Sequence, residues 1–567
     1  MQEKIEQKYS KIKQDTVNHI KILLDEINVA KNKELESEIE QLKNELKEIK
    51  KLKKYWLVWE NKQEVFDKEA IWKLPILKEV KKNDIFNNNN NNKSNILIEW
   101  DNYHTLSVLN YTHKWKIDVI YIDPPYNRWW DFIYNDRKIE KDDKFKHSMW
   151  LSFMNKRLNL AKKILSNNWV LIISIDEYEY AWLELLCNEI FWEEHVETMI
   201  WRKSWEGRDW KMKNTATFRK DHEYIIFCFN WENKLNKIKE KPNFQNKYNN
   251  PDNDPRWEFK AWSISKKESA SNINHKNYYT VISPSWKKFT RQFDISKKEF
   301  EKLNNDKLEN IEWKKVSRIY WWKEDTAVPS LKIFINEERN ITPYSILLNK
   351  WTTTDWTKEV SDILKKDCSR MRPKPVSLIS TLIQISSNKD SIILDFFAWT
   401  WTTWEATENV NKKFWWNRRF ILCTDNKEWI CLDYCYPRIS KTIKWNLKYL
   451  RTDFIDKHKS NDDLRVRMVN RCSELLCLKE NIWEEINQKN DKIKLFKRND
   501  KYLAILYDMF YFNEFKKILS SLDKQVSIYA FSHYKLLKEN FEDIWMPFEI
   551  EDIPDPILEV YDTIFWL

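Results

Sequence analysis

The sequence predicts an α/β fold in which a mostly parallel sheet is interrupted by one long insertion. Short β-branched runs at 95–100, 117–123 and 169–176 alternate with segments of helical period, and such alternation is typical of parallel sheets covered by helices. From about residue 202 the pattern gives way to polar, turn-rich sequence, and it returns at 372–398. We therefore expect an α/β domain made of two separated halves.

The predicted segments follow these changes in pattern. They are an N-terminal helical or coiled-coil segment at 1–60, a first α/β half at 61–201, the insertion at 202–345, a second α/β half at 346–450 and a mixed region at 451–567. Apolar residues in the first segment recur from Leu35 to Ile49 with alternating steps of four and three, which predicts a short helical seam. The seam serves either as a homodimer contact or as a packing surface against the rest of the chain.

Composition narrows the functional classes. The formal net charge is +10, which suits a polyanionic partner without establishing one. The eight cysteines include no closely spaced Cys-x-x-Cys pair, so we expect reduced thiols, no disulfide framework and no metal site. We recognise no signal peptide and no apolar run of membrane-spanning length, and we therefore expect a cytoplasmic protein without a membrane partner.

The strongest motif is "VIYIDPPYN", which spans 119–127. A buried strand ends at Asp123, Pro124, Pro125 and Tyr126, and α/β folds bind ligands at this edge of the sheet. These residue types suit an exocyclic amine on a flipped base. The carboxylate accepts one N–H, a backbone carbonyl of the rigid Pro-Pro segment accepts the other, and the tyrosine ring stacks on the base. The alternative is an ordinary turn after a strand.

A second strand leads into "DFFAWTWTTWEA", where Trp399, Trp401 and Trp404 stand in a turn. The chain contains 33 Trp but 1 Gly, whereas glycine usually makes up about 7% of a protein. We hypothesise that most of these tryptophans are glycines whose UGA codons were read with the wrong genetic code. A protein that is genuinely rich in tryptophan is the alternative. With glycine restored, the segment becomes a loop whose backbone can approach a nucleoside cofactor closely.

Together these motifs resemble those of the amino-methylating DNA methyltransferases. The catalytic motif precedes the cofactor motif, which is the order of the β group, including the modification subunits of type III restriction systems. Further segments similar to that group are "LIEWDN" (97–102), "RPKPVSLI" (372–379) and "WWNRRFIL" (415–422). The family pattern has glycine where this chain has Trp100, Trp399, Trp401, Trp415 and Trp416.

The resemblance implies a Rossmann-like, S-adenosylmethionine-dependent methyltransferase sheet, permuted in sequence and split by a target-recognition insertion. It assigns Asp123, Pro124, Pro125 and Tyr126 to the catalytic pocket. The residues it assigns to S-adenosylmethionine are Asp395, Phe396, Phe397, Ala398, Trp399, Thr400 and Trp401, with Lys374 and Pro375 nearby. Asp101 and Asp425 lie at strand ends, where they either bind polar groups of the cofactor or are ordinary surface carboxylates.

The function implied is site-specific methylation of adenine N6 in double-stranded DNA, as the modification component of a restriction–modification system. Aspartate at the head of the catalytic motif favours adenine within this family. The alternatives are methylation of cytosine N4 or of RNA, or a catalytically silent DNA-binding subunit if the tryptophans are real. A separate restriction subunit is a plausible partner, since we recognise no helicase or nuclease motif in the chain.

Overall fold

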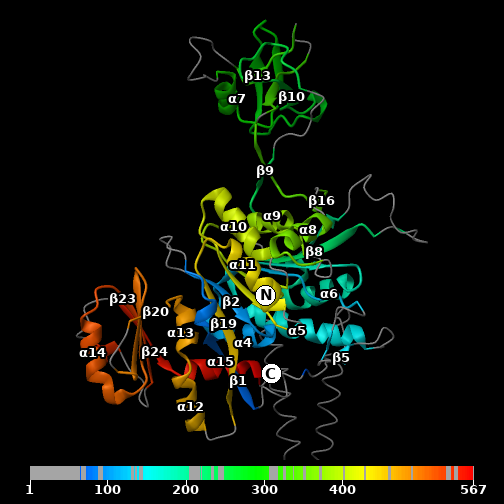
Figure 1. Cartoon of the computed structure of the whole chain (residues 1–567). Helices are drawn as coiled ribbons and strands as arrows, with labels where there is room; N and C mark the ends of the chain where they lie inside the picture. Colours follow the sequence, from blue (N-terminus) through cyan, green and yellow to red (C-terminus); the bar gives the residue numbers. More distant parts are fainter. Residues whose placement is uncertain are drawn as a thin grey trace, which may run out of the picture. The chain divides into compact units, whose positions relative to one another are not determined.

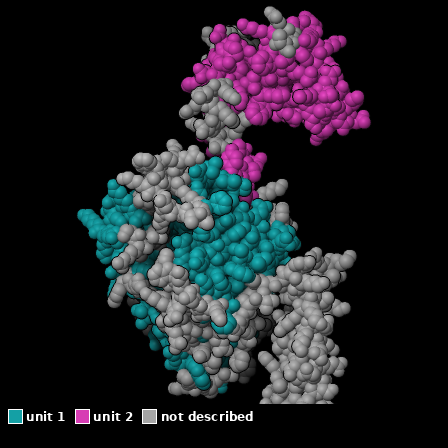
Figure 2. All heavy atoms as spheres, turned by 90° about the vertical axis from the view of Figure 1, so that its right-hand side faces the viewer, with its two compact units in different colours: residues 1–233, 345–380, 388–567 teal, residues 234–344, 381–387 magenta. Residues whose placement is uncertain are grey.

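The computed structural model describes residues 64, 72–86, 94–128, 133–134, 137–138, 145–203, 218, 220–230, 235–240, 248–305, 317–323, 327–335, 337–348, 353–368, 373–399, 402–426, 430–457, 461–486, 490–531, 538–541 and 547–565. The predicted N-terminal helical seam lies outside these residues. The chain forms two compact units (Figure 2). Unit 1 comprises 1–233, 345–380 and 388–567, and unit 2 comprises 234–344 and 381–387.

Unit 1 is built on a 10-stranded sheet (Figure 1). In spatial order its strands are β1 (Lys73–Glu79), β19 (Leu447–Asp456), β2 (Asn95–Glu99), β18 (Arg419–Thr424), β17 (Ile392–Asp395), β3 (Ile117–Ile122), β6 (Leu165–Ile175), β8 (His222–Phe229), β7 (Val196–Arg202) and β16 (Ile346–Leu347). The central strands from β19 to β6 run parallel, whereas β1 and β8 pair antiparallel with their neighbours. This arrangement confirms the predicted mostly parallel α/β sheet.

Helices cover both faces of this sheet (Figure 1). On one face, α4 (Asn102–Thr112), α5 (Lys146–Ile164) and α6 (Tyr180–Phe191) pack against Ile96, Ile98 and Ile421. On the other face, α10 (Thr402–Phe414) and α11 (Tyr436–Thr442) pack against Leu97 and Leu422. The strands are apolar on both sides because both sides are buried, as expected of a parallel sheet between two helical layers.

The two motifs from distant parts of the sequence meet at the centre of the sheet. Strand β17 pairs in parallel with β3, with Leu394 opposite Ile120. The chain leaves β17 for α10 on one face, and the next long helix after β3, α5, lies on the other face. Adjacent parallel strands whose connections diverge in this way form a topological switch point, which is where open α/β sheets bind their ligands.

Further helices and a second sheet complete unit 1. The helices α8 (Thr353–Leu364), α12 (Asn461–Asn470), α13 (Ser473–Glu480), α14 (Phe512–Ser520) and α15 (Asp555–Phe565) belong to unit 1, as does the first part of α9 (Val376–Ser386), up to residue 380. The second sheet has the strands β20 (Glu484–Ile486), β21 (Ile493–Lys497), β22 (Lys501–Leu506), β23 (Gln525–Phe531) and β24 (Phe548–Ile553), in that order. Its own apolar core includes Phe515 and Ile528.

Two segment boundaries differ from those expected from the sequence. Strand β8 lies in the main sheet between β6 and β7, so the compact unit that interrupts the α/β domain begins at Lys234 rather than at 202. Strand β19 runs through the expected boundary at 450, because it pairs with β2 and β1 along its length. Among the described residues, no helix is long and apolar enough to cross a membrane.

Four tryptophans have a backbone conformation that suits glycine. Trp115, Trp192, Trp286 and Trp415 all have positive φ, between 56° and 78°. Trp415 follows α10 with φ 56°, and the next amide donates to the Asn411 carbonyl at 3.2 Å. This is the six-to-one hydrogen bond of a helix end whose left-handed residue is normally glycine. Trp192, with φ 78° and ψ 140°, lies close to a region that only glycine enters freely, at a cost of about 1–3 kcal/mol for other residues.

In the part of the chain that the structure describes, unit 2 contains small antiparallel sheets, the helix α7 and the end of α9. Its other elements and α7 have the bounds β9 (Ile238–Glu240), β10 (Phe259–Ser263), β11 (Tyr278–Ile282), β12 (Lys288–Gln292), α7 (Lys297–Asn304), β13 (Ile319–Tyr320), β14 (Ser330–Phe334) and β15 (Arg339–Ile341). A cluster around Phe293 and Phe300 forms its apolar core. Polar contacts within the unit supplement this core.

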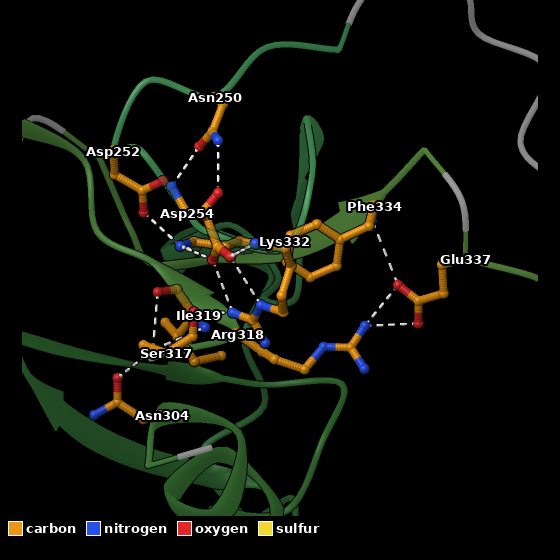
Figure 3. Close-up of polar contacts among 11 residues, drawn as sticks. Asn250, Asp252, Asp254, Asn304, Ser317, Arg318, Ile319, Lys332, Phe334 and Glu337 are labelled. Carbon is orange, nitrogen blue, oxygen red and sulfur yellow. Dashed lines mark hydrogen bonds and ion pairs between the residues drawn. The ribbon is translucent and has the colours of Figure 1, made fainter. Parts of the chain in front are cut away.

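A buried carboxylate, Asp254, organises those polar contacts (Figure 3). Its two oxygens accept hydrogen bonds from Arg256 at 2.9 and 2.8 Å, and the Lys332 ammonium lies 2.7 Å from one of them. The Asn250 side chain binds the backbone of Asp254 on both sides. Burial raises the pKa of Asp254, but its hydrogen bonds to Arg256 and Lys332 outweigh burial and bring that pKa to about 2.

Replacing Asp254 with asparagine is expected to destabilise unit 2 by about 1–3 kcal/mol, because it removes the carboxylate that pairs with Arg256 and leaves the buried Lys332 only the more exposed Asp252. In the parent chain, ionised Asp254 stabilises unit 2 fully above the pKa that the aspartate has in the unfolded chain, about 3.9. This stabilisation is lost as the pH falls toward the folded-state pKa of about 2. Hydrogen exchange of peptides from 248–341 in the full chain measures both effects. Unchanged protection would contradict the prediction, and the exposed Asp294→Asn, expected to change stability by no more than about 0.5 kcal/mol, is the control.

Candidate active site

A lysine between two carboxylates lies at the carboxyl end of β3. The Lys374 ammonium is 2.8 and 2.9 Å from the two oxygens of Asp123 and 3.4 Å from Oε2 of Glu223. The Tyr126 hydroxyl donates to Asp123 at 2.7 Å, and Lys374 Nζ lies 4.8 Å from the centre of the Tyr126 ring. A second lysine, Lys203, pairs with the other oxygen of Glu223 at 3.1 Å. Thus β3, β8 and the segment before α9 converge on one polar cluster.

The pKa values in this cluster follow from burial and from the opposed charges. Burial raises the pKa of Asp123, and Lys374 opposes this effect only in part. Burial lowers the pKa of Lys374, but attraction to Asp123 and Glu223 outweighs burial and places that pKa above its ordinary value. Burial would raise the pKa of Glu223, yet Lys374 and Lys203 hold it below its ordinary value. The lysine therefore remains charged at neutral pH, as does Glu223.

Buried side chains form hydrogen bonds to the loop after β3. The Trp150 indole is fully buried and donates to the Pro125 carbonyl at 2.7 Å. Asn127 has φ 55° and donates through its side chain to Glu179 at 2.6 Å. The same Glu179 oxygen lies 2.7 Å from His147 Nδ1. These contacts hold the residues on both sides of Tyr126, as a supporting layer does beneath a functional site.

The loop after β17 is anchored by a buried carboxylate and a half-buried amide. Asp395 accepts a hydrogen bond from the Phe397 N–H at 3.0 Å and another from the Thr403 hydroxyl. Burial raises the pKa of Asp395 to about 7, although these two hydrogen bonds lower it. The Asn102 side chain donates to the Phe396 carbonyl at 3.0 Å and so ties the loop to the start of α4.

Most of the loop residues predicted from the sequence line the carboxyl edge of β17. Phe396, Phe397 and Ala398 are buried, and Trp399 is 38% exposed. Thr400 and Trp401 lie outside the described residues. The Lys374 carbonyl accepts the Thr402 hydroxyl at 2.9 Å, which places the segment carrying Lys374 and buried Pro375 against the start of α10. The two motifs therefore share Lys374, which the resemblance placed only near the cofactor.

The two remaining acidic residues differ in their surroundings. Asp101 follows β2 and caps α4, because its Oδ1 accepts the Tyr103 N–H at 2.8 Å. Asp425 follows β18 and is half-buried. Both occupy the carboxyl edge of the parallel strands, as the sequence predicted. Asp101 already has a structural role there as a helix cap.

Four residues at the site carried no functional prediction from the sequence. None of Glu223, Lys203, Asn102 and Glu179 was singled out from the sequence. Their partners come from distant segments, so no local spacing shows the contacts. Among the described residues there is no cluster of three or more His, Cys, Asp or Glu side chains arranged to hold a metal ion.

A parallel sheet with Asp-Pro-Pro-Tyr at one strand end, beside a loop from the adjacent strand, defines a DNA methylase. The family model of the N6/N4 DNA methylases matches residues 117–434, and the chain belongs to this family. The match begins at β3 and ends after β18, so it includes the catalytic cluster, unit 2 and the loop after β17.

The chain is also similar in sequence to individual curated DNA-modification proteins. The Mod subunit of the type III restriction–modification enzyme StyLTI of Salmonella typhimurium is 27% identical over 381 residues, covering 62% of this chain and 55% of that protein. The EcoP15I Mod subunit of Escherichia coli is 25% identical over 376 residues, covering 56% of each chain. The type II methyltransferase M.KpnI of Klebsiella pneumoniae is 27% identical over 382 residues, covering 63% of this chain and 87% of that protein. The chain thus spans about half the length of the two Mod subunits.

Proposed function

We propose that this protein transfers a methyl group from S-adenosylmethionine to N6 of adenine in double-stranded DNA, as the modification component of a restriction–modification system. The observation that carries the proposal is the pairing of β3 with β17, which brings Asp123 and the loop after Asp395 to the same edge of the sheet. The family membership and the names of the Mod relatives support it.

In this proposal the chain orients the target amine by hydrogen bonds. Asp123 accepts one N–H. The Trp150 indole already donates to the Pro125 carbonyl, so the Pro124 carbonyl is the acceptor that we assign to the second N–H. The Tyr126 ring supports the extruded base, as aromatic rings do in base-flipping enzymes. The amine lone pair would then point away from the loop after β3, which holds the two N–H groups. The rate gain would come from positioning and electrostatics.

S-Adenosylmethionine, when bound, would supply an electrophilic methyl group on its sulfonium. The loop from Asp395 to Ala398 and the segment at Lys374 fit such a cofactor in backbone position, because they line the switch point beside Asp123. Trp404 lies in α10 and not in the turn expected from the sequence. Its indole is buried in the apolar core beside Leu97 and Phe420, and its N–H has no hydrogen-bond acceptor among the described residues.

We therefore also propose that Trp399, Trp401 and Trp404 stand where the natural protein has glycine. The positive φ of Trp192 and Trp415 supports this proposal outside the cofactor loop. By contrast, the buried and hydrogen-bonded Trp150 has the environment of a true tryptophan. Peptide mass spectrometry of the native protein across 395–406 decides the matter: glycine at the three positions is expected, and tryptophan at all three would refute the proposal.

The test of the proposed function is transfer of a labelled methyl group from S-adenosylmethionine by the glycine-restored protein. We expect label in duplex DNA and none in RNA of the same sequence. Label in RNA alone, or in neither polymer, would rule out the proposed substrate.

Partners follow from the same proposal. The sequence assigned target recognition to 202–345. Because β8 belongs to the main sheet, we assign it to 234–344 of unit 2, whose basic and aromatic residues suit contacts to phosphates and bases. DNA cleavage would then require a separate restriction subunit, and co-purification of the chain with the product of a neighbouring gene tests this. Homodimerisation through 1–60 is a further proposal, which the mass of the full chain in solution tests.

A further inference from the structure

Both oxygens of the carboxylate that the proposed function assigns to the target amine are already in contact with Lys374. Lys374 Nζ lies 2.8 and 2.9 Å from the two oxygens of Asp123, and the Tyr126 hydroxyl donates to one of them. A carboxylate can accept about four hydrogen bonds, so these contacts take most of the acceptor positions of Asp123. Withdrawal of the lysine from one Asp123 oxygen would open that oxygen to an entering adenine amine.

A buried ammonium cannot leave one carboxylate unless another acceptor receives it, because an unpaired buried charge is very costly. Glu223 provides that acceptor. Its Oε2 is 3.4 Å from Lys374 Nζ, and its side chain is 11% exposed, close to the 9% of Lys374 itself. A shift of Nζ by a fraction of an ångström, which the flexible lysine side chain permits, would convert this ion pair into a direct hydrogen bond.

The other contacts of Glu223 keep it ready for this role. Lys203 binds its opposite oxygen, Oε1, at 3.1 Å, so Oε2 stays directed toward the site. The Tyr126 hydroxyl lies 3.3 Å from the same Oε2. Lys203 thus holds one oxygen of Glu223, and the other oxygen faces Lys374.

We propose that Glu223 is a positioning residue that receives Lys374 from Asp123 when the target amine enters. The inference rests on the proposed function, because it concerns the same amine site. In this scheme Glu223 does not touch the substrate. It acts through Lys374, and it makes Asp123 available as an acceptor without leaving a buried lysine unpaired.

Steady-state methylation by the glycine-restored protein tests the proposal. Glu223→Gln removes the charge that attracts Lys374, so the lysine stays on Asp123. We expect kcat to fall about a hundredfold, as for other losses of active-site positioning, with the KM for S-adenosylmethionine nearly unchanged. Glu223→Asp keeps the charge and is expected to restore part of the lost rate. Glu480→Gln removes another buried carboxylate paired with a lysine and is expected to leave kcat unchanged.

A double variant shows whether Glu223 acts through Lys374. In a Lys374→Met background, Glu223→Gln is expected to have no further effect on kcat. An equal loss in both backgrounds, or a Glu223→Gln protein with the parent rate, would overturn the proposal. If Lys374→Met does not fold, the comparison of Gln and Asp at position 223 decides alone. A Glu223→Asp protein as slow as Glu223→Gln would then overturn the proposal. A parent protein that methylates no DNA would instead refute the proposed function before any variant is compared.

Discussion

Replacing Asp123 with alanine is expected to abolish methyl transfer to DNA while leaving the affinity for S-adenosylmethionine largely intact. The carboxylate is the acceptor that orients the target amine, and loss of one such electrostatic contact typically slows a reaction by about 10²–10³-fold. The fold should survive, because Lys374 keeps Glu223 as a partner at 3.4 Å. Labelled methyl transfer measures the rate, and calorimetry with S-adenosylmethionine measures the affinity.

The exposed Asp390, which precedes β17, provides the matched control, and Asp390→Ala should have parent activity. An Asp123→Ala protein that keeps most of the parent turnover would remove Asp123 from the mechanism. Loss of cofactor affinity to the same extent as activity would instead assign Asp123 to cofactor binding.

Restoring glycine at Trp399, Trp401 and Trp404 is expected to raise the affinity of the protein for S-adenosylmethionine. We expect S-adenosylmethionine to bind the glycine-restored protein at least about a hundredfold more tightly, a difference of about 2.7 kcal/mol. One overpacked bulky side chain typically costs about 1–3 kcal/mol, so one or two indoles that stand in the place of the cofactor would account for a difference of this size. Equilibrium dialysis with labelled cofactor on both proteins gives the ratio.

Trp150→Gly is the matched control for that experiment. Its indole is buried and binds the Pro125 carbonyl, so its loss should destabilise the protein by about 3–5 kcal/mol and should not improve cofactor binding. Equal affinity of the printed and glycine-restored chains for S-adenosylmethionine would contradict the glycine proposal for the cofactor loop.

The frame of the site was predictable from the sequence because it depends on local patterns. The run at 117–123 and the strand that leads into the second motif were expected to lie in one parallel sheet, and the carboxyl ends of parallel strands in one sheet meet at one edge. The structure confirms the strands and their adjacency at Leu394 and Ile120.

The contacts within the site were not predictable, because they depend on registers between segments far apart in the chain. Lys374 was expected beside the cofactor, yet its ammonium binds Asp123 from the other motif. Glu223 belongs to an antiparallel strand that reaches the site only because β8 pairs with β6. The central contact of unit 2 was not predictable either, because Asp254 contacts Lys332 from a strand far along the chain.

Identification of the methylated nucleoside tests the central claim most directly. Duplex DNA is incubated with the glycine-restored protein and S-adenosylmethionine carrying a deuterated methyl group, digested to nucleosides and analysed by mass spectrometry. The account predicts label in N6-methyl-2′-deoxyadenosine, and its loss in the Asp123→Ala protein. Label in N4-methyl-2′-deoxycytidine, or no labelled nucleoside at all, would contradict it.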